Sequence, residues 1–234
     1  MAEVRIVLVR PENAVNVGAV ARIVRNTGLA GIDLVAPGDW RTVECWRTAW
    51  RAQDVLEQAR VFASLREALA ETELAVGLSG RRDAGIAPLD VREAAERVVG
   101  LAPDARAALV LGAEASGLSR DELVLCGLRA RIAAHPDQPS LNLSHAAMVV
   151  AYEVYRAGAA TPPGPRLATH EEKAQLLELL QTGLRAVGAV PPRNAGAHLR
   201  DWTALVHRAP LTPREVKLLA HLARKLASRP SVAS

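Results

Sequence analysis

The residues most able to do chemistry fall into three short clusters. The first is Asn16-Val-Gly18-Ala-Val-Ala-Arg22. Its asparagine could cap a helix, its glycine would let another backbone come close, and its arginine offers a planar guanidinium suited to phosphate. Taken alone, this pattern is more typical of a capped amphipathic helix that carries a solvated arginine. The chemistry that it could support is the binding of an anion by Arg22.

The second cluster runs from Leu109 to Ser119 (LVLGAEASGLS) and joins an apolar run to two glycines and a carboxylate. Gly112 and Gly117 predict a backbone that bends tightly around a ligand after a buried strand, with Glu114 between them. The glycine spacing matches a Walker A loop, but Leu118 stands where that loop needs lysine. No GxGxxG motif occurs, which disfavours a nicotinamide cofactor. The alternative is a strand exit with turn glycines and a surface carboxylate.

The third cluster extends from Pro136 to Ser144 (PDQPSLNLS) and precedes a long apolar segment. Hydroxyl, amide and backbone groups are concentrated here between a predicted strand and a predicted helix. They could be presented to a ligand at that junction. Ser140 and Asn142 could equally be turn and helix-cap residues.

Other kinds of site find less support in the sequence. The six histidines show no HExxH motif and no Cys/His cluster, so no metal site is predicted. The segment Gly77-Leu-Ser-Gly-Arg81 is not the G-x-S-x-G nucleophile elbow, because its last glycine is displaced. Arg81 and Arg82 fall on a predicted loop, where they could contact phosphate or simply be solvated.

The elements that must position these clusters alternate between apolar strands and amphipathic helices. Strands are predicted at Arg5–Arg10, Gly31–Pro37, Arg60–Phe62, Leu74–Leu78, Ala107–Leu111 and Ala130–Ala134. Helices are predicted at Asn16–Thr27, Thr42–Ala59, Val91–Val99 and Leu143–Arg156, with two more after the capping boxes at Ser64 and Ser119. This alternation predicts an α/β fold with a mainly parallel, doubly wound sheet. Such sheets bind ligands at the carboxyl ends of their strands, so we expect the site in the loops after Leu78, Leu111 and Ala134.

The last third of the chain has a different character. Gly158–Pro165 (GAATPPGP) predicts a linker. Three helices are expected beyond it: one after Thr169, one that ends at His207 and one after Thr212. We therefore expect a domain at 1–157, a linker at 158–168 and a basic helical extension at 169–234. Residues 1–160 carry 18 Lys/Arg and 20 Asp/Glu, whereas residues 161–234 carry 11 and 5. This charge favours phosphate binding by the extension, although a solvated helical face would have the same composition.

The sequence also predicts where the protein works. No run approaches the roughly 18 consecutive apolar residues of a membrane-spanning helix. The N-terminal MAEVRIVLVRPENA lacks the layout of a secretory signal. Cys45 and Cys126 form no CxxC motif, which is typical of packed thiols in a reducing compartment. We expect a cytoplasmic protein with no membrane partner.

Together and in this order, the three clusters resemble the motifs of the SpoU/TrmH family of SPOUT-class, S-adenosylmethionine-dependent RNA 2′-O-ribose methyltransferases. The matching patterns are N-x-G-x-x-x-R from Asn16, LGxExxGLS from Leu111 and SLNLSxAxxxxxYE from Ser140, and they span residues 16–153. The opening VRIVLVRPENAVNVGAVAR and the helical extension are most similar to the TrmJ subgroup. Its members methylate the ribose of nucleotide 32 in the tRNA anticodon loop.

The resemblance implies a trefoil knot at the carboxyl end of the domain and a homodimer whose active sites are completed across the interface. It implies that S-adenosylmethionine is held in three knotted loops, largely by backbone groups. The residues that match these loops are Leu78, Ser79, Gly80, Gly112, Gly117, Ile132, Pro139, Ser140 and Leu141. The expected partner is RNA, most of all tRNA, with Arg22, Arg81 and Arg82 as contacts.

The reaction that the resemblance implies is attack of a ribose 2′-hydroxyl on a sulfonium methyl group. Arg22 matches the catalytic arginine of the family. Because arginine stays protonated, we expect Arg22 to hold the adjacent phosphate and stabilise the developing alkoxide rather than act as a base. Asn16 and Glu114 would hold Arg22 and the loops in place, and Ser140 and Asn142 would orient the substrate and the knot.

Two alternatives stay open. The enzyme could perform the same reaction on ribosomal RNA or at another position of tRNA. Gln138 and Pro139 stand where some TrmJ-like chains carry an aromatic residue and a serine, so nucleotide preference is open as well. The other alternative is a catalytically inert family member that binds RNA through its basic extension.

Overall fold

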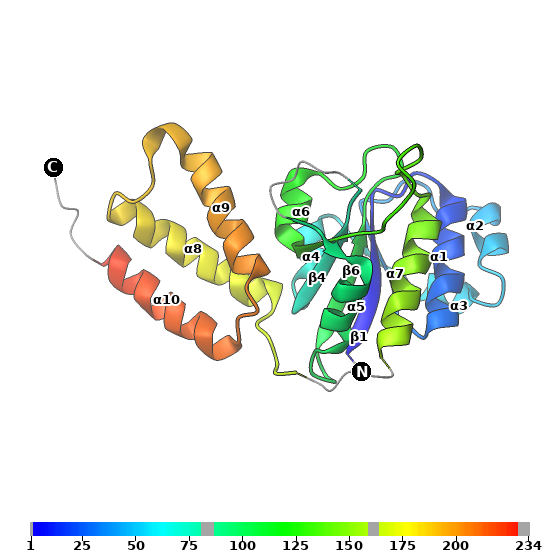
Figure 1. The fold of residues 1–234 in the computed structure, drawn as a ribbon, viewed down its shortest axis with the longest axis horizontal. Coiled ribbons are helices and arrows are strands. Elements are labelled where there is room, and N and C mark those ends of the chain that lie inside the picture. The colour runs from blue at the N-terminus through cyan, green and yellow to red at the C-terminus, as the bar shows by residue number, and fades with distance from the viewer. Residues whose placement is uncertain (1, 81–86, 159–163, 229–234) are drawn as a thin grey trace.

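A computed structural model describes residues 2–80, 87–158 and 164–228, and it is built around a seven-stranded sheet (Figure 1). The strand order is β3-β2-β1-β6-β4-β7-β5, and every pairing between these strands is parallel. The strands are β1 (Glu3–Val9), β2 (Gly31–Val35), β3 (Arg60–Phe62), β4 (Leu74–Leu78), β5 (Leu89–Asp90), β6 (Arg106–Leu111) and β7 (Gly127–Arg131). The predicted α/β fold with a parallel sheet is confirmed.

Helices cover both faces of the sheet, as a parallel sheet requires. One face packs against α1 (Ala14–Thr27), α5 (Val91–Val99) and α7 (Leu143–Ala157), with the short helices α2 (Val43–Thr48) and α3 (Gln53–Glu57) beside α1. The other face packs against α4 (Leu65–Leu69) and α6 (Arg120–Cys126). Along β1, Ile6 and Leu8 enter the first core, whereas Val7 and Val9 enter the second. This period of two gives a strand with no polar face.

The two largest differences from the predicted boundaries in this domain concern one helix and one strand. The helix expected over Thr42–Ala59 is interrupted between α2 and α3, where Arg51 has a left-handed backbone with φ 61°. The apolar pattern continues across the break because both helices pack on the same core, so it gave no sign of the interruption. The strand expected over Ala130–Ala134 occupies Gly127–Arg131 instead, which places Ile132 in the following loop. The two-residue strand β5 has no counterpart among the predicted strands.

The first helix begins earlier than the sequence suggests. Asn13, not Asn16, is its N-cap, and the Asn13 side chain accepts a hydrogen bond from the backbone nitrogen of Val15 at 2.9 Å. The prediction that Asn16 caps the helix is therefore wrong. Asn16 lies within the first turn and is only 5% exposed, which frees its amide for contacts with other segments.

The predicted helical extension is present as α8 (His170–Ala186), a 3₁₀ turn (Pro192–Asn194), α9 (Ala195–Arg208) and α10 (Pro213–Ala227). These helices form a bundle at one end of the molecule (Figure 1) and share a core separate from those of the sheet. The bundle also docks on the sheet domain: the His170 backbone nitrogen donates to the Thr72 carbonyl at 2.7 Å, and the Leu167 nitrogen donates to the Glu73 carboxylate at 2.7 Å. The division at residues 158–168 stays a prediction, because residues 159–163 lie outside the described part of the chain.

Candidate active site

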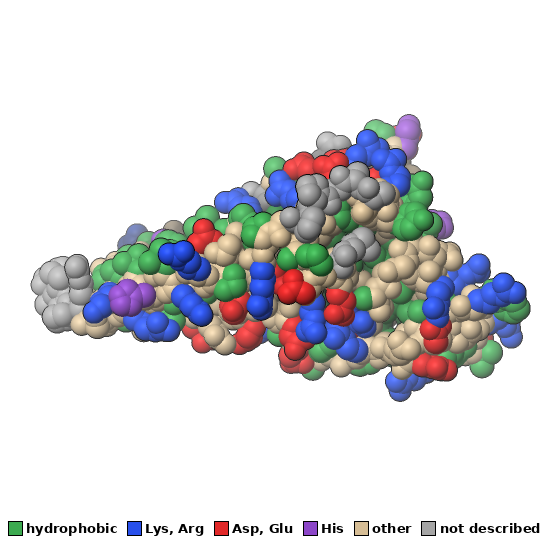
Figure 2. All heavy atoms as spheres, turned by 90° about the horizontal axis from the view of Figure 1, so that it is seen from below, with side chains coloured by type: hydrophobic (Ala, Val, Ile, Leu, Met, Phe, Trp, Pro, Cys, Tyr) green, Lys and Arg blue, Asp and Glu red, His purple; other side chains and the backbone are tan. Residues whose placement is uncertain are grey.

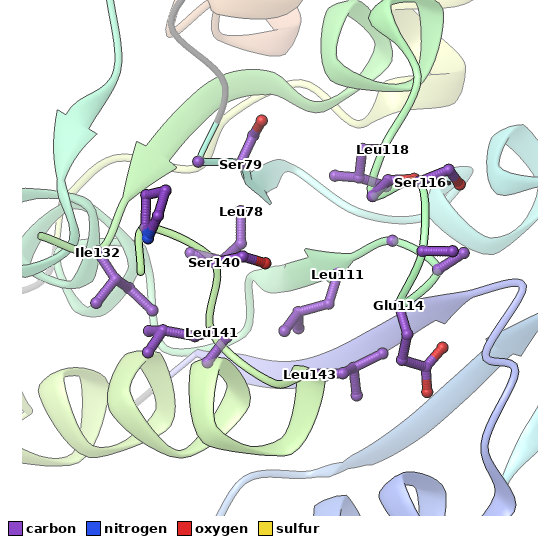
Figure 3. A pocket seen from close by; sticks show the side chains of 17 residues that line it. Leu78, Ser79, Leu111, Glu114, Ser116, Leu118, Ile132, Ser140, Leu141 and Leu143 are labelled. Carbon is purple, nitrogen blue, oxygen red and sulfur yellow. Dashed lines mark hydrogen bonds between the residues drawn. The ribbon is translucent and has the colours of Figure 1, made fainter. Parts of the chain in front are cut away.

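A pocket of about 370 Å³ lies at the carboxyl ends of β4, β6 and β7 (Figure 3). Three segments far apart in sequence form its walls: the residues after β4, the turn after β6, and the segment that leads from β7 into α7. All nine residues expected to bind the methyl donor line it, namely Leu78, Ser79, Gly80, Gly112, Gly117, Ile132, Pro139, Ser140 and Leu141. The structure therefore brings these nine positions together, as expected for one ligand held by three loops.

The turn after β6 has a backbone that only glycine fits. A Cβ atom on Gly112 would lie 2.1 Å from the carbonyl carbon of Gly117, so the two strands of the turn are in direct backbone contact. Gly117 has a left-handed φ of 65°, and its nitrogen donates to the Ala113 carbonyl at 2.7 Å. Both glycines are thus needed for the close approach and tight bend that shape this wall of the pocket.

Glu114 projects from this turn toward the start of α1. Its carboxylate accepts hydrogen bonds from the Asn16 side-chain amide at 2.8 Å and from the backbone nitrogens of Glu12 at 2.8 Å and Asn13 at 3.2 Å. Partial burial acts to raise the pKa of Glu114, but the hydrogen bonds from Asn16 and from the backbone outweigh it, and the pKa is lowered. Glu114 is therefore an ionised acceptor that fixes the loop before α1 against the turn after β6.

Asn16 extends the same network to the third motif. Its side-chain oxygen accepts a hydrogen bond from the Asn142 amide nitrogen at 3.2 Å. The Asn142 oxygen in turn caps α7, accepting from the backbone nitrogen of Ser144 at 2.9 Å and from the Ser144 hydroxyl at 2.7 Å. Asn142 is thus the helix cap that one sequence interpretation expected, and it also joins α7 to α1. One chain of hydrogen bonds, Glu114 to Asn16 to Asn142, connects the three motifs.

Arg22 lies apart from the pocket. It projects from the exposed side of α1 and is not among the lining residues. Its guanidinium makes no hydrogen bond or ion pair with any residue that the structure describes. The structure therefore does not join Arg22 to the donor-binding loops within one copy of the chain. Arg81 and Arg82, the other expected RNA contacts, lie outside the described residues.

Some lining residues have no place in the predicted site. Leu143 and Ala146 of α7 and Leu111 and Leu118 beside the glycine turn contribute apolar surface to the pocket. All four are specified positions of the matched motifs, so their motif positions alone could have indicated them. The backbone nitrogens of Glu12 and Asn13, which bind Glu114, could not be found this way because any residue type carries them.

Other chemistry has no visible support among the described residues. Within 2–80, 87–158 and 164–228, no group of three or more His, Cys, Asp or Glu side chains is placed to hold a metal ion. Neither thiol is activated: burial raises the pKa of Cys45 to about 11 and raises that of Cys126 further. No helix in the described part of the chain is long and apolar enough to cross a membrane.

The parallel sheet, the pocket at its carboxyl edge and the hydrogen bonds among the three motifs fit an RNA methyltransferase of the SPOUT class, and the comparisons with known proteins show that the chain is one. The chain belongs to the SpoU rRNA Methylase family, because the sequence model of that family matches residues 3–152. The family match covers all the strands, the pocket and most of α7.

Individual relatives match almost the whole chain. The tRNA (cytidine/uridine-2′-O-)-methyltransferase TrmJ of Klebsiella pneumoniae subsp. pneumoniae is 34% identical over 229 residues, which is 94% of each chain. The protein of the same name from Salmonella typhimurium is 40% identical over 173 residues, which cover 74% of this chain and 71% of the relative. The crystal structure of TrmJ from Z. mobilis ZM4 superposes with a TM-score of 0.81 at 28% identity and covers 95% of this chain and 98% of that one.

Proposed function

We propose that this enzyme transfers the methyl group of S-adenosylmethionine to the ribose 2′-hydroxyl of a cytidine or uridine in tRNA, and that its target is nucleotide 32. The observation that carries the proposal is the convergence of all nine expected donor-binding residues on one pocket. The activity named for the relatives supports tRNA and these two nucleotides. Position 32 rests on the resemblance to the TrmJ subgroup.

The pocket fits the donor in size and in character. Its volume of about 370 Å³ lies within the usual range for a site that holds a nucleoside-sized ligand. S-adenosylmethionine, when bound, supplies a sulfonium methyl group that is already electrophilic. Leu111, Ile132, Leu141 and Leu143 offer apolar surface to a purine, and the backbone of residues 78–80 and 112 offers hydrogen-bonding groups. The protein then has to position a ribose oxygen in line with the methyl group.

Arg22 is the residue that we assign to the substrate side of the reaction. An exposed guanidinium with no acidic partner among the described residues is available to grip an RNA phosphate and to stabilise negative charge on the 2′-oxygen. The proton of the hydroxyl leaves to phosphate or water. Asn16, Glu114 and Asn142 are positioning residues in this scheme, because their hydrogen bonds fix α1 relative to the donor loops. Ser140, exposed at the rim of the pocket, would orient the substrate.

A second copy of the chain would bring Arg22 to a pocket. On the outer side of α7, Met148, Tyr152 and Tyr155 are 38%, 48% and 60% exposed, and their spacing places them on one side of the helix. Val15 adds a further apolar side chain on neighbouring α1 at 40% exposure. We propose that this α1–α7 surface pairs two protomers, so that Arg22 of one meets the pocket of the other.

The extension is the proposed second contact for tRNA. Its helices expose the cations Arg185, Arg200, Arg208, Arg214, Lys217, Arg224 and Lys225. Lys173 is the exception, because it is only 1% exposed and burial lowers its pKa to about 8, with Glu73 acting against this. The exposed charge is suited to the RNA backbone, and modification of tRNA would place the enzyme in the cytoplasm.

The decisive experiment is methylation of total tRNA by the purified full chain with S-adenosylmethionine, followed by mass-spectrometric mapping of the modified nucleoside. A 2′-O-methylated cytidine or uridine at position 32 is expected. R22A should abolish transfer while donor binding by calorimetry and the melting temperature stay close to wild type. Methylation of a base would refute the mechanism. Methylation of ribosomal RNA alone would show that ribosomal RNA, and not tRNA, is the substrate. Absence of donor binding by the wild type would favour the inert RNA-binding alternative.

A further inference from the structure

The turn between α2 and α3 exposes an aromatic ring among arginines. Trp50 is 61% exposed, whereas Trp40 of the same region is 6% exposed and belongs to the core. Arg47 lies in the last turn of α2, three residues before Trp50, and the guanidinium carbon of Arg51 lies 5.9 Å from the centre of the Trp50 ring. Figure 2 shows hydrophobic side chains between basic ones at this end of the molecule, where Figure 1 places α2 and α3. Trp50 therefore contributes little to folding from its present position.

The backbone at this turn is held in a costly conformation. Arg51 has a φ of 61°, and among the described residues only two other non-glycine residues, Arg10 and Ala36, have positive φ. L-residues with side chains as large as arginine disfavour this region because the Cβ atom approaches the following carbonyl. Glycine would adopt the same turn without that cost. The backbone of Arg51 thus places its guanidinium beside the Trp50 ring in spite of that cost.

This surface adjoins the proposed catalytic arginine. Gly18 of α1 lies directly against α2, since a Cβ atom there would be 2.2 Å from the Cys45 carbonyl oxygen. Arg22 follows Gly18 by four residues, which places it on nearly the same side of α1, one turn further along. Arg25 reaches Asp54 of α3 in an ion pair and fixes the two helices together. Arg22 thus emerges beside the turn that carries Trp50.

We propose that Arg47, Trp50 and Arg51 form a site for an unpaired nucleotide of the RNA next to the target. The Trp50 ring stacks on the base, and the two arginines hold the flanking phosphates. Charge favours RNA over a protein partner, because Arg22 and Arg51 make no ion pair with any described residue, whereas Arg25 pairs with Asp54 and Arg47 interacts with the nearby Glu44 carboxylate. This inference rests on the proposed function and adds a contact that selects a single-stranded loop.

The test compares W50A, W50F and R51G with wild type in binding to a tRNA anticodon stem–loop, measured by fluorescence anisotropy. W50A should weaken binding roughly 5- to 150-fold, the usual range for loss of one stacked base, and W50F should restore most of it. Binding of a fully paired RNA hairpin stem should change much less. V61A, which shortens an apolar side chain that is 52% exposed on the edge strand β3, is the matched control and should bind as wild type.

R51G separates a binding role from a structural one. Glycine relieves the left-handed backbone, so the melting temperature should rise while RNA affinity falls. Wild-type affinity in W50A or in R51G would overturn the inference. A change in the mass of W50A by light scattering would also overturn it, because the surface would then join two copies of the chain. Methylation of tRNA by the wild type is measured in parallel: if it occurs while W50A binds normally, only this inference fails.

Discussion

Asn16 is the residue at which the proposed architecture is most directly testable. The change N16A removes the amide donor to Glu114 and the acceptor for Asn142. N16D keeps the shape but puts a carboxylate within hydrogen-bond distance of the ionised Glu114. N16A therefore tests the loss of both hydrogen bonds, whereas N16D tests the replacement of an attraction to Glu114 by a repulsion.

The magnitude follows from the two hydrogen bonds. A hydrogen bond to a charged group, such as Glu114, is worth about 1.5–3 kcal/mol, and a neutral one, such as that from Asn142, about 0.5–1.5 kcal/mol. N16A should therefore lower the free energy of unfolding by about 2–4 kcal/mol. For a chain of this size that corresponds to a fall in melting temperature of roughly 4–16 °C. Asn16 is 5% exposed, so water cannot easily replace its amide as a partner of Glu114.

N16D adds a dependence on pH with a definite sign. Two neighbouring carboxylates cannot both ionise without repulsion, so the folded state raises one pKa of the pair above its unfolded value. The folded protein then binds a proton that the unfolded chain does not, and the variant loses stability as pH rises through that raised pKa. The gap between wild type and N16D should be wide at pH 8 and narrow at pH 5.

The assay is thermal unfolding of wild type, N16A, N16D and N26D from pH 5 to pH 8. Asn26 is exposed on the same helix, so N26D controls for the general effect of converting asparagine to aspartate on α1. If N16A melts within a degree of wild type, the hydrogen bonds contribute nothing. If the gap for N16D is the same at every pH, the contact between the introduced carboxylate and Glu114 is not formed.

Three further predictions concern other parts of the molecule. G112A should weaken S-adenosylmethionine binding by calorimetry at least tenfold, because its Cβ would lie 2.1 Å from Gly117, whereas G38A, with open space around it, should bind normally. Burial, with His170 and Lys173 adding to it, lowers the pKa of His207 to about 3. The free energy of unfolding should therefore be at its full value above pH 6.5 and fall as pH drops below it. In H207F this dependence of stability on pH should be weaker. Removal of residues 166–234 should weaken tRNA binding and flatten its salt dependence while donor binding survives; unchanged tRNA affinity would refute a role for the extension.

The sheet and the pocket could be predicted because local patterns encode them. Apolar runs of β1, β4 and β6 alternate with amphipathic helices, and in a parallel sheet this is enough to place their carboxyl ends along one edge. The glycines at 112 and 117 were informative for the same local reason, since only glycine fits that turn. Asn142 could be named as a helix cap from its position, but the place of Asn16 and Asn142 in one site was indicated only through the resemblance of the three clusters taken together.

The errors arise where distant segments decide local structure. The strand before the third motif is β7 at Gly127–Arg131, and its first residue, Gly127 with φ 78°, lies against the backbone of His207 in α9. A single-sequence pattern contains no information about that contact. Arg129 in the middle of β7 is only 2% exposed, and a buried arginine hides a strand from any search for apolar runs. Arg51, in the turn between α2 and α3, adopts a left-handed backbone against the preference of its residue type.

The Glu114 network explains why each motif is weak alone and specific in combination. Asn16 is an unremarkable helical residue until Glu114 accepts its amide, and Asn142 is an ordinary helix cap until its free amide group reaches Asn16. Each of these three residues provides a hydrogen-bond partner for a polar group on another segment, so the stabilisation that any one contributes depends on the other two. The contribution of Asn16 therefore comes from a contact almost 100 residues away, with Glu114 of the turn that forms the pocket wall. Arg22 lies on the same helix but shares none of these hydrogen bonds, so the network fixes the helix that carries Arg22 while its guanidinium stays exposed, as the proposed contact with RNA phosphate requires.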